Sequence, residues 1–270
     1  MTSHARVTVG SREYLLEYEW ISRERSASPL LVFLHEGLGS VAMWRDWPRQ
    51  VCAAGGFRGL VYSRPGYGRS TPRDPSEQWP VDFMHSQAHQ VLPAFLQAVD
   101  VDAAAKPPWL IGHSDGASIA LLHAAAFPDR VAGVIAMAPH VLVEDLSIES
   151  IARTRETYLA TTDTQGPSLR VKLGRYHDDP DSAFWGWNDI WLDPTFRSWN
   201  IEAQLTSITK PVLVIQGEDD EYGTMAQVDS LARQVPHAQL LKLSQCGHSP
   251  QRDQPQQVIK AIIDFIATHT

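Results

Sequence analysis

Residues 109–120, Trp109-Leu110-Ile111-Gly112-His113-Ser114-Asp115-Gly116-Ala117-Ser118-Ile119-Ala120, join an apolar run to an alanine-rich run through the pattern Gly-x-Ser-x-Gly. A serine at a sharp turn between a strand and a helix has a strained backbone, and only glycine avoids collisions at positions 112 and 116. The turn would raise the Ser114 hydroxyl above the sheet and leave the backbone N–H of Asp115 free for a developing oxyanion. The pattern alone recurs by chance, and the flanking strand and helix are what favour a nucleophile elbow.

The composition is that of an ordinary globular protein. The chain has 270 residues, of which 43% are hydrophobic and 20% are charged, with a mean hydropathy of −0.23. Length alone allows two domains, although α/β folds of this size often form one body with an insertion. With 31 acidic and 23 basic residues, the formal net charge of −8 disfavours nucleic acids and anionic membranes as partners. These numbers leave the oligomeric state open.

Cysteine usage and the N-terminus bear on the compartment. The two cysteines, Cys52 and Cys246, are too few for a disulfide framework and wrongly spaced for a zinc site. They favour a reducing compartment. Residues 1–6 lack the apolar core of a signal peptide, and no later run approaches the length of a membrane span. We therefore expect a cytoplasmic protein without a membrane partner.

Short apolar runs alternate with helical segments along the chain. Such runs are typical of strands that are buried on both faces of a parallel sheet. Besides the run before Ser114, the predicted buried strands are residues 30–34, 59–62, 131–138, 211–215 and 239–243. Near the N-terminus, residues 7–9 and 14–20 predict an antiparallel hairpin at the sheet edge. The sequence thus predicts an α/β fold: a mostly parallel central sheet with helices on both faces.

Three further helices have recognisable end signals. Ser40 in the N-cap position predicts a helix from residue 41 to about residue 54. Apolar residues at helical spacing predict a second helix over 81–99, in which Pro93 should introduce a kink. The last helix is expected over 255–267, where a proline occupies the first turn. These helices would supply the layers that cover the sheet.

The alternation of strands and helices breaks between residues 141 and 209. Polar helical stretches at 147–158 and 168–177 precede a segment rich in aromatic residues that includes Trp187 and Trp191. We expect a helical lid over the active-site mouth, with at least one of these tryptophans bordering the pocket. The alternative is that the aromatic side chains only hold the insertion to the main body. The expected division is an α/β core of residues 1–140 and 210–270 and an inserted lid of residues 141–209.

Polar residues follow several predicted strands, at the carboxyl edge where an open α/β sheet places its ligand. The glycine-containing turn at 35–39 is either an oxyanion-donating loop or simply a tight turn. Four carboxylates at 218–221 would repel one another unless one of them pairs with a histidine. His248 follows the last strand. His140 either lines the pocket or is a polar loop residue.

Together, the Gly-His-Ser-Asp-Gly elbow, the acid after Val-Leu-Val-Ile-Gln-Gly, the Cys-Gly-His-Ser-Pro loop and the His-Glu-Gly-Leu-Gly turn resemble the α/β-hydrolase superfamily. The resemblance spans nearly the whole chain, and the order serine, acid, histidine is the one that the fold requires. It implies a catalytic triad of Ser114, Asp220 and His248. In relatives the acid sits three residues beyond the glycine that ends its strand, which favours Asp220 over Asp219.

The same resemblance implies the oxyanion hole. Relatives usually carry His-Gly-x after the first buried strand and use the N–H of the third residue, which here is Gly37; Asp115 would supply the second N–H. The second residue is Glu36 instead of glycine, and it either contacts a polar substrate, tunes the site or bonds to the loop backbone. His113 is expected in the pocket wall rather than as the general base. The predicted pocket residues are Glu36, His113, His140, Trp187 and Trp191.

A Ser-His-Asp triad attacks a carbonyl and forms an acyl-enzyme, and it needs no metal or organic cofactor. The leading hypothesis is a serine hydrolase that cleaves a small-molecule carboxylic ester or lactone. The nearest alternative is carbon–carbon hydrolysis of ring-fission diketone-type products. Relatives with that activity often carry Trp after the catalytic histidine, where this chain has Ser249. A non-catalytic ligand-binding member is a further alternative, against which the complete triad argues.

Overall fold

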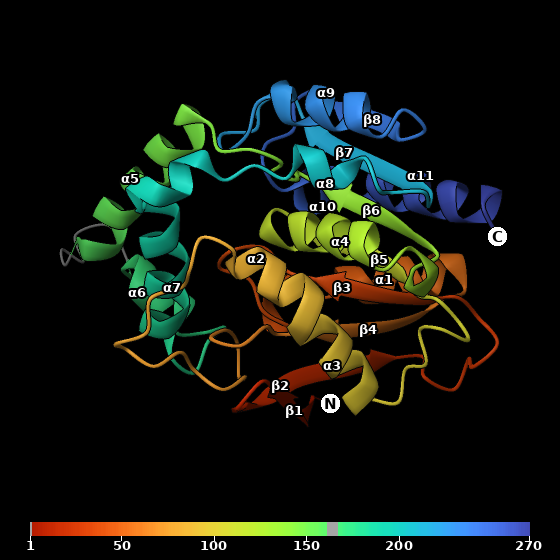
Figure 1. The fold of residues 1–270 in the computed structure, drawn as a ribbon, viewed down its shortest axis with the longest axis horizontal. Coiled ribbons are helices and arrows are strands. Elements are labelled where there is room, and N and C mark those ends of the chain that lie inside the picture. The colour runs from red at the N-terminus through yellow and green to blue at the C-terminus, as the bar shows by residue number, and fades with distance from the viewer. Residues whose placement is uncertain (1, 161–166) are drawn as a thin grey trace.

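In residues 2–160 and 167–270, which the computed structural model describes, eight strands form one sheet in the order β1-β2-β4-β3-β5-β6-β7-β8 (Figure 1). Neighbours from β4 to β8 are parallel, whereas β2 is antiparallel to both β1 and β4. The strands are β1 Ser3–Val9, β2 Arg12–Ile21, β3 Leu30–Leu34, β4 Arg58–Tyr62, β5 Trp109–His113, β6 Gly133–Met137, β7 Val212–Gly217 and β8 Gln239–Leu243. The predicted α/β fold, including the N-terminal hairpin, is confirmed.

Helices cover both faces of the sheet, and alternate residues of β3 pack against the helices on opposite faces. Every residue of β3 is buried, because Leu31 and Phe33 pack on one face while Leu30, Val32 and Leu34 pack on the other. The first face is covered by α1 (Trp47–Gly55) and α11 (Pro255–Thr268). The second is covered by α2 (Phe83–Ser86), α3 (Leu92–Ala98), α4 (Asp115–Ala126) and α9 (Met225–Gln234).

The helix predicted from residue 41 is wrong in its start. A short 3₁₀ turn, η1 (Ala42–Trp44), comes first, and α1 begins only at Trp47. The Ser40 hydroxyl accepts from the N–H of Met43 at 3.3 Å, so it bonds to the short turn, whose N-cap is Val41, and not to the α-helix. The physical reason is Pro48, which lacks an N–H and is tolerated only in the first turn of a helix.

The helix predicted over 81–99 is divided near the proline. Helix α2 passes into a π-helical turn, η2 (Gln87–Val91), and α3 then begins with Pro93 in its first turn. Because proline cannot donate to the carbonyl one turn earlier, the chain changes its hydrogen-bond spacing immediately before it. The apolar face is continuous all the same, since Met84, Leu92 and Phe95 belong to one core cluster.

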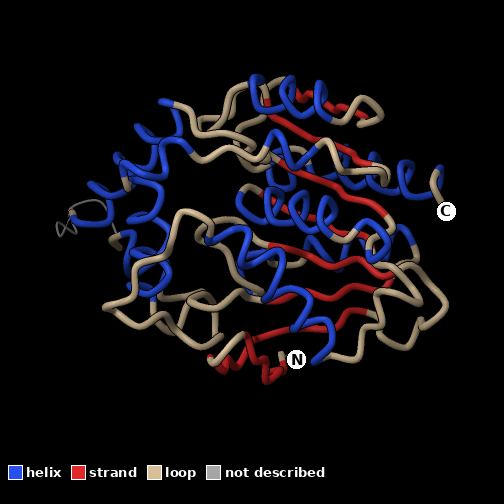
Figure 2. Tube along the Cα trace, in the orientation of Figure 1, coloured by secondary structure: helices blue, strands red, loops and turns tan. Residues whose placement is uncertain are grey.

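The segment between β6 and β7 is a helical insertion, most of which Figure 2 shows grouped beside one end of the strands, whereas its last helix packs against α4 and α9. Its elements are α5 (Asp145–Leu159), α6 (Leu169–Leu173), α7 (Pro180–Leu192), the 3₁₀ turn η4 (Pro194–Ser198) and α8 (Glu202–Leu205). The helix predicted at 168–177 is shorter in the structure, where α6 ends at Leu173 and Gly174 is its C-cap. A bridge between Leu142 and Asn200 joins the two ends of the insertion. No helix in the described ranges is both long and apolar enough to cross a membrane.

Candidate active site

Ser114 lies at the junction of β5 and α4 with φ 53° and ψ −122°, a backbone conformation that costs energy for a residue with a side chain. The flanking glycines leave the room that this turn needs. A Cβ at Gly112 would lie 2.3 Å from the carbonyl oxygen of Gly116, and one at Gly116 would lie 2.1 Å from that of Leu34. These two close backbone approaches leave no space for a side chain at position 112 or 116, as the sequence predicts for the elbow.

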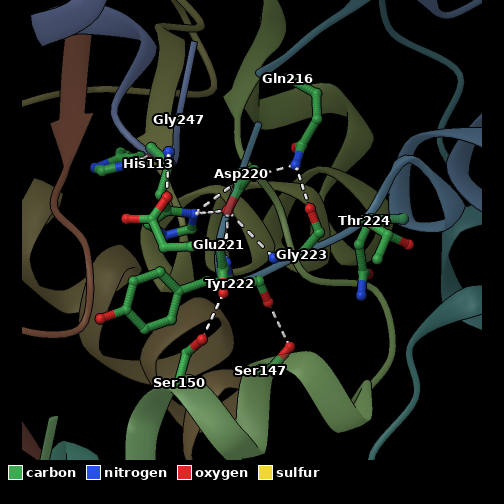
Figure 3. Close-up of polar contacts among 12 residues, drawn as sticks. His113, Ser147, Ser150, Gln216, Asp220, Glu221, Tyr222, Gly223, Thr224 and Gly247 are labelled. Atoms are coloured by element: carbon green, nitrogen blue, oxygen red, sulfur yellow. Dashed lines mark hydrogen bonds and ion pairs between the residues drawn. The ribbon is translucent and has the colours of Figure 1, made fainter. Parts of the chain in front are cut away.

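Asp220 and His248 form a hydrogen-bonded pair at the carboxyl ends of β7 and β8. The Nδ1 of His248 lies 2.9 Å from both carboxylate oxygens of Asp220. That carboxylate also accepts from the N–H of Tyr222 at 2.8 Å, from the N–H of Gly223 at 3.2 Å and from Nε2 of Gln216 at 2.8 Å (Figure 3). The neighbouring Asp219 is exposed, so the structure pairs His248 with Asp220.

The electrostatics of this pair suit a histidine that accepts protons. Burial alone would raise the pKa of Asp220, but the hydrogen bond and charge of His248 outweigh burial, and the pKa lies below its ordinary value. For His248, burial lowers the pKa, and the hydrogen bond and charge of Asp220 more than compensate, so the pKa is raised. Because Nδ1 donates to Asp220, the other ring nitrogen, Nε2, is left as the proton acceptor.

A cavity of about 240 Å³ joins residues that the sequence places far apart. It is lined by Ser114 and His248, by the two expected oxyanion donors Gly37 and Asp115, and by all five predicted pocket residues, Glu36, His113, His140, Trp187 and Trp191. Within residues 2–160 and 167–270, neither the N–H of Gly37 nor that of Asp115 has a hydrogen-bond acceptor. Both donors are therefore available to a ligand.

Some cavity residues were not singled out from the sequence: Leu38, Met43, Ile151, Leu173, Tyr222, Ser249 and Arg252. Tyr222 had a usable signal, because it follows Asp220 by two residues, and its ring centre lies 4.8 Å from that of His248. Arg252 lies on α10 (Pro250–Asp253), one turn beyond His248. The apolar residues had no such signal, since Ile151 and Leu173 look like any core residues of amphipathic helices.

Glu36 is paired with a side chain. Its Oε2 lies 3.5 Å from Nδ1 of His113, and about one fifth of its side chain is exposed. Burial raises the pKa of Glu36, but the hydrogen bond and charge of His113, together with the charge of His35 and a backbone hydrogen bond, outweigh burial, and the pKa lies well below its usual range. His113 in turn donates from Nε2 to the carbonyl oxygen of His248 at 2.6 Å. His113 thus supports the histidine loop through the backbone.

His140 lines the cavity as a neutral ring. It is almost fully buried, and burial lowers its pKa to about 3. The ring centre lies 4.9 Å from Trp191 and 5.8 Å from His248. Among the described residues, no cluster of three or more His, Cys, Asp or Glu side chains is arranged to hold a metal ion.

Known proteins share this architecture. The chain is 24% identical over 258 residues to the 2-hydroxy-6-oxo-6-phenylhexa-2,4-dienoate hydrolase of Burkholderia cepacia, covering 88% of this chain and 87% of that protein. A carboxylesterase structure from Nitrososphaera gargenis is similar with a TM-score of 0.75 and 19% identity, covering 98% of both chains. The enol-lactonase structure from Burkholderia xenovorans has a TM-score of 0.72 and 17% identity, covering 97% of this chain and 99% of that one.

At these identities the structural similarities bear on the fold alone. The family assignment rests on a sequence profile. The profile of the Alpha/beta hydrolase family matches residues 31–261 and so includes the elbow, the acid loop and the histidine loop. Because this match spans most of the chain, the protein belongs to the alpha/beta hydrolase family.

Proposed function

We propose that this hydrolase is a serine hydrolase that cleaves a small-molecule carboxylic ester or lactone through an acyl-enzyme. The observation that carries the proposal is the arrangement of one cavity. It is lined by Ser114 at a strained elbow and by His248, whose Nδ1 is held 2.9 Å from the Asp220 carboxylate. A serine is a weak nucleophile near neutral pH, so it needs a base of this kind.

The reaction follows from these groups. The Ser114 oxygen attacks the substrate carbonyl carbon while Nε2 of His248 takes its proton, and Asp220 stabilises the resulting imidazolium. The carbon–oxygen bond to the leaving alcohol breaks, and the alcohol takes the proton from His248. Water then attacks the acyl-enzyme, again giving its proton to His248, and the carboxylic acid leaves as Ser114 is reprotonated. A lactone follows the same steps, with both product groups remaining in one molecule.

The two free N–H groups suit the developing negative charge. Gly37 and Asp115 both line the cavity and would donate to the oxyanion of the tetrahedral intermediate. One such donor is typically worth about 3 kcal/mol of transition-state stabilisation. No role in the proton transfers is assigned to His140, because burial keeps its ring neutral.

The cavity favours a small substrate. Its volume of about 240 Å³ and its largely apolar and aromatic wall match a compact acyl group or lactone ring. Four of the wall residues, Ile151, Leu173, Trp187 and Trp191, come from the insertion. We therefore propose that residues 141–209 act as a lid on a core of residues 1–140 and 210–270.

Carbon–carbon hydrolysis of a ring-fission diketone-type product is the alternative. The name of the Burkholderia cepacia relative favours it, although the identity is only 24%. Against it stands Ser249, which occupies the position where hydrolases of that kind often carry Trp. A binding protein without turnover is a weaker alternative, since it would not need the Asp220–His248 pair.

A direct test compares the wild type with Ser114→Ala on a short p-nitrophenyl ester, a small lactone and a diketone-type ring-fission product. We expect ester or lactone turnover by the wild type and a loss of at least about 10⁴-fold in the variant. A fluorophosphonate should label the wild type and not the variant. Turnover of the diketone alone would support the carbon–carbon alternative, and unchanged ester turnover in Ser114→Ala would exclude the mechanism.

A further inference from the structure

The peptide unit that carries the Gly37 N–H is fixed by hydrogen bonds to its carbonyl oxygen. The carbonyl of Glu36 belongs to the same peptide unit, and in a trans peptide the C=O and N–H point in opposite directions. That carbonyl accepts from Nδ1 of His35 at 2.7 Å, from Nη2 of Arg64 at 2.9 Å and from the backbone N–H of Gly39 at 3.0 Å. Three donors, two of them side chains, therefore hold the peptide in the direction in which the Gly37 N–H points.

Arg64 is a fully buried cation. Its side chain has no exposed surface, and Nη2 also lies 3.8 Å from a carboxylate oxygen of Asp115. Its backbone N–H donates to Nε2 of His35 at 3.0 Å, which fixes the His35 tautomer that donates to Glu36. Within the described residues, Nε and Nη1 of Arg64 have no hydrogen-bond partner. Burying a guanidinium whose donors lack partners lowers the stability of the folded state. The position of Arg64 is therefore not explained by stability alone.

Asp115 links this cation to the insertion. It carries the second free N–H of the expected oxyanion hole, and its side chain is fully buried. One carboxylate oxygen faces Arg64, and the other accepts from Nε1 of Trp191 at 3.2 Å. Trp191 lies on α7 of the insertion and is itself almost fully buried. An indole of the insertion thus bonds directly to the residue that follows Ser114.

The same helix also contacts the first donor. A Cβ added at Gly37 would lie 2.3 Å from the Cδ1 and Nε1 atoms of Trp187, so the indole rests against the Gly37 backbone. Trp187 and Trp191 are four residues apart on α7 and therefore project from the same face of the helix. One face of α7 therefore touches both of the cavity residues expected to donate to the oxyanion.

We propose that Arg64, Trp187 and Trp191 are positioning residues that align the two oxyanion donors, so that the oxyanion hole is complete only with α7 docked on the core. The contacts close a ring from the Glu36–Gly37 peptide through Arg64, Asp115 and α7 back to Gly37. This inference rests on the proposed serine-hydrolase function. It assigns to the insertion a part in transition-state stabilisation, beyond shaping the cavity.

Trp191→Phe is the most selective variant, because it keeps most of the packing and removes the N–H that donates to Asp115. Trp199→Phe is the matched control: Trp199 is also a buried tryptophan of the inserted region, it does not line the cavity, and its Nε1 has no partner among the described residues. Arg64→Met removes the donor to the Glu36 carbonyl. The measurements are kcat and KM for a p-nitrophenyl ester, Tm, and the inhibition constant of phenylboronic acid, whose adduct with a serine resembles the tetrahedral intermediate.

We expect kcat to fall about tenfold in Trp191→Phe and on the order of 100-fold in Arg64→Met, with KM changed less than about twofold. The boronate inhibition constant should rise by the same factors, while Trp199→Phe matches the wild type in kcat. Because Arg64 contacts the Asp115 carboxylate as well as the Glu36 carbonyl, and Trp191 donates to that same carboxylate, the double variant should lose less than the product of the single losses.

Three results would overturn the proposal. The first is a Trp191→Phe variant with wild-type kcat and boronate affinity. The second is an equal loss of kcat in Trp191→Phe and Trp199→Phe that follows the loss of Tm, which is what packing alone predicts. The third is a double variant whose loss of kcat equals the product of the losses in Arg64→Met and Trp191→Phe. Full activity in Ser114→Ala would instead reject the proposed function on which this inference rests.

Discussion

The two sides of Ser114 are built in different ways. On the acid–histidine side, the Asp220 carboxylate takes its hydrogen bonds from Gln216, Tyr222, Gly223 and His248, all of which lie on the loops that follow β7 and β8 or at the end of β7. On the oxyanion side, the contacts come from the loops after β3 and β4, from the start of α4 and from α7 of the insertion.

The difference lies in how the insertion takes part. On the acid–histidine side it bonds to the residues that follow Asp220: Ser147 and Ser150 of α5 donate to the carbonyl oxygens of Tyr222 and Glu221 (Figure 3), and the Thr154 hydroxyl lies 3.2 Å from that of Tyr222. On the oxyanion side, Trp187 and Trp191 contact the donor residues themselves. The proposed base thus takes its hydrogen bond to Asp220 from core residues, whereas the proposed oxyanion donors are themselves in contact with the insertion.

The largest effect is expected on the acid–histidine side, from Asp220→Asn. The amide would favour the wrong tautomer of His248, and kcat should fall by about 10⁴-fold with little change in the fold. Asp219→Asn is the matched control, because this neighbouring carboxylate is exposed. Steady-state kinetics on a p-nitrophenyl ester distinguishes the two. Similar losses in both variants would contradict the assignment of Asp220.

On the oxyanion side, Gly37→Ala should have the next largest effect. The new methyl group would collide with the Trp187 indole at 2.3 Å, so either the donor loop or α7 must move. We expect kcat to fall by about 100-fold, as for the loss of one oxyanion donor, with a smaller change in KM. Gly174→Ala is a control with space, since its nearest non-neighbouring atom is 3.5 Å away. A wild-type kcat in Gly37→Ala would show that catalysis does not depend on the position of the Gly37 N–H.

The pH dependence reports on the base. Neutral His248 accepts the serine proton, so kcat/KM should fall tenfold per pH unit as the pH drops below the pKa of His248. Asp220 raises that pKa above the ordinary histidine value of 6.5. The midpoint of the acid limb should therefore lie at a higher pH than for a free histidine. His140, whose pKa is about 3, should add no second step in this range. Hence His140→Asn should leave the midpoint in place, and a midpoint displaced by that substitution would argue against a neutral His140.

Glu36→Gln should have the smallest effect. Its negative charge is one of the groups that raise the pKa of His248, so removing it should shift the acid limb of kcat/KM to lower pH. The amide keeps the shape and a polar group within reach of His113, and kcat at the plateau should change by less than about threefold. A pH–rate profile measures both quantities. A shift to higher pH, or a loss as large as that of Gly37→Ala, would mean that Glu36 contacts the substrate instead.

Several elements could be predicted because their signals are local. The buried strands and the elbow are continuous stretches, and the periodicity of β3 or the glycines around Ser114 can be recognised without knowing the fold. The start of α1 differs from the prediction for an equally local reason, since Ser40 indicates a start at residue 41 whereas Pro48 lies in the first turn of the helix that forms. Here two local signals competed, and the proline, which cannot donate an N–H, prevailed.

The role of Glu36 shows where local signals end. From the sequence, three interpretations of this residue remained open, because nothing near position 36 identifies its partner. The partner, His113, is brought to it by the parallel pairing of β3 and β5, whose carboxyl ends meet at one edge of the sheet. Arg252 could not be identified as a cavity residue for the same reason.

The sequence by itself determined the fold class, the elbow at Ser114, and the order of serine, acid and histidine, because each depends on periodicity or on residues close together in the chain. Only the tertiary structure decided how Asp220 faces His248, which further residues line the cavity, and how Arg64, Trp187 and Trp191 surround the two expected oxyanion donors. These contacts join distant segments, and their geometry follows from how the helices pack on the sheet, which no local pattern encodes.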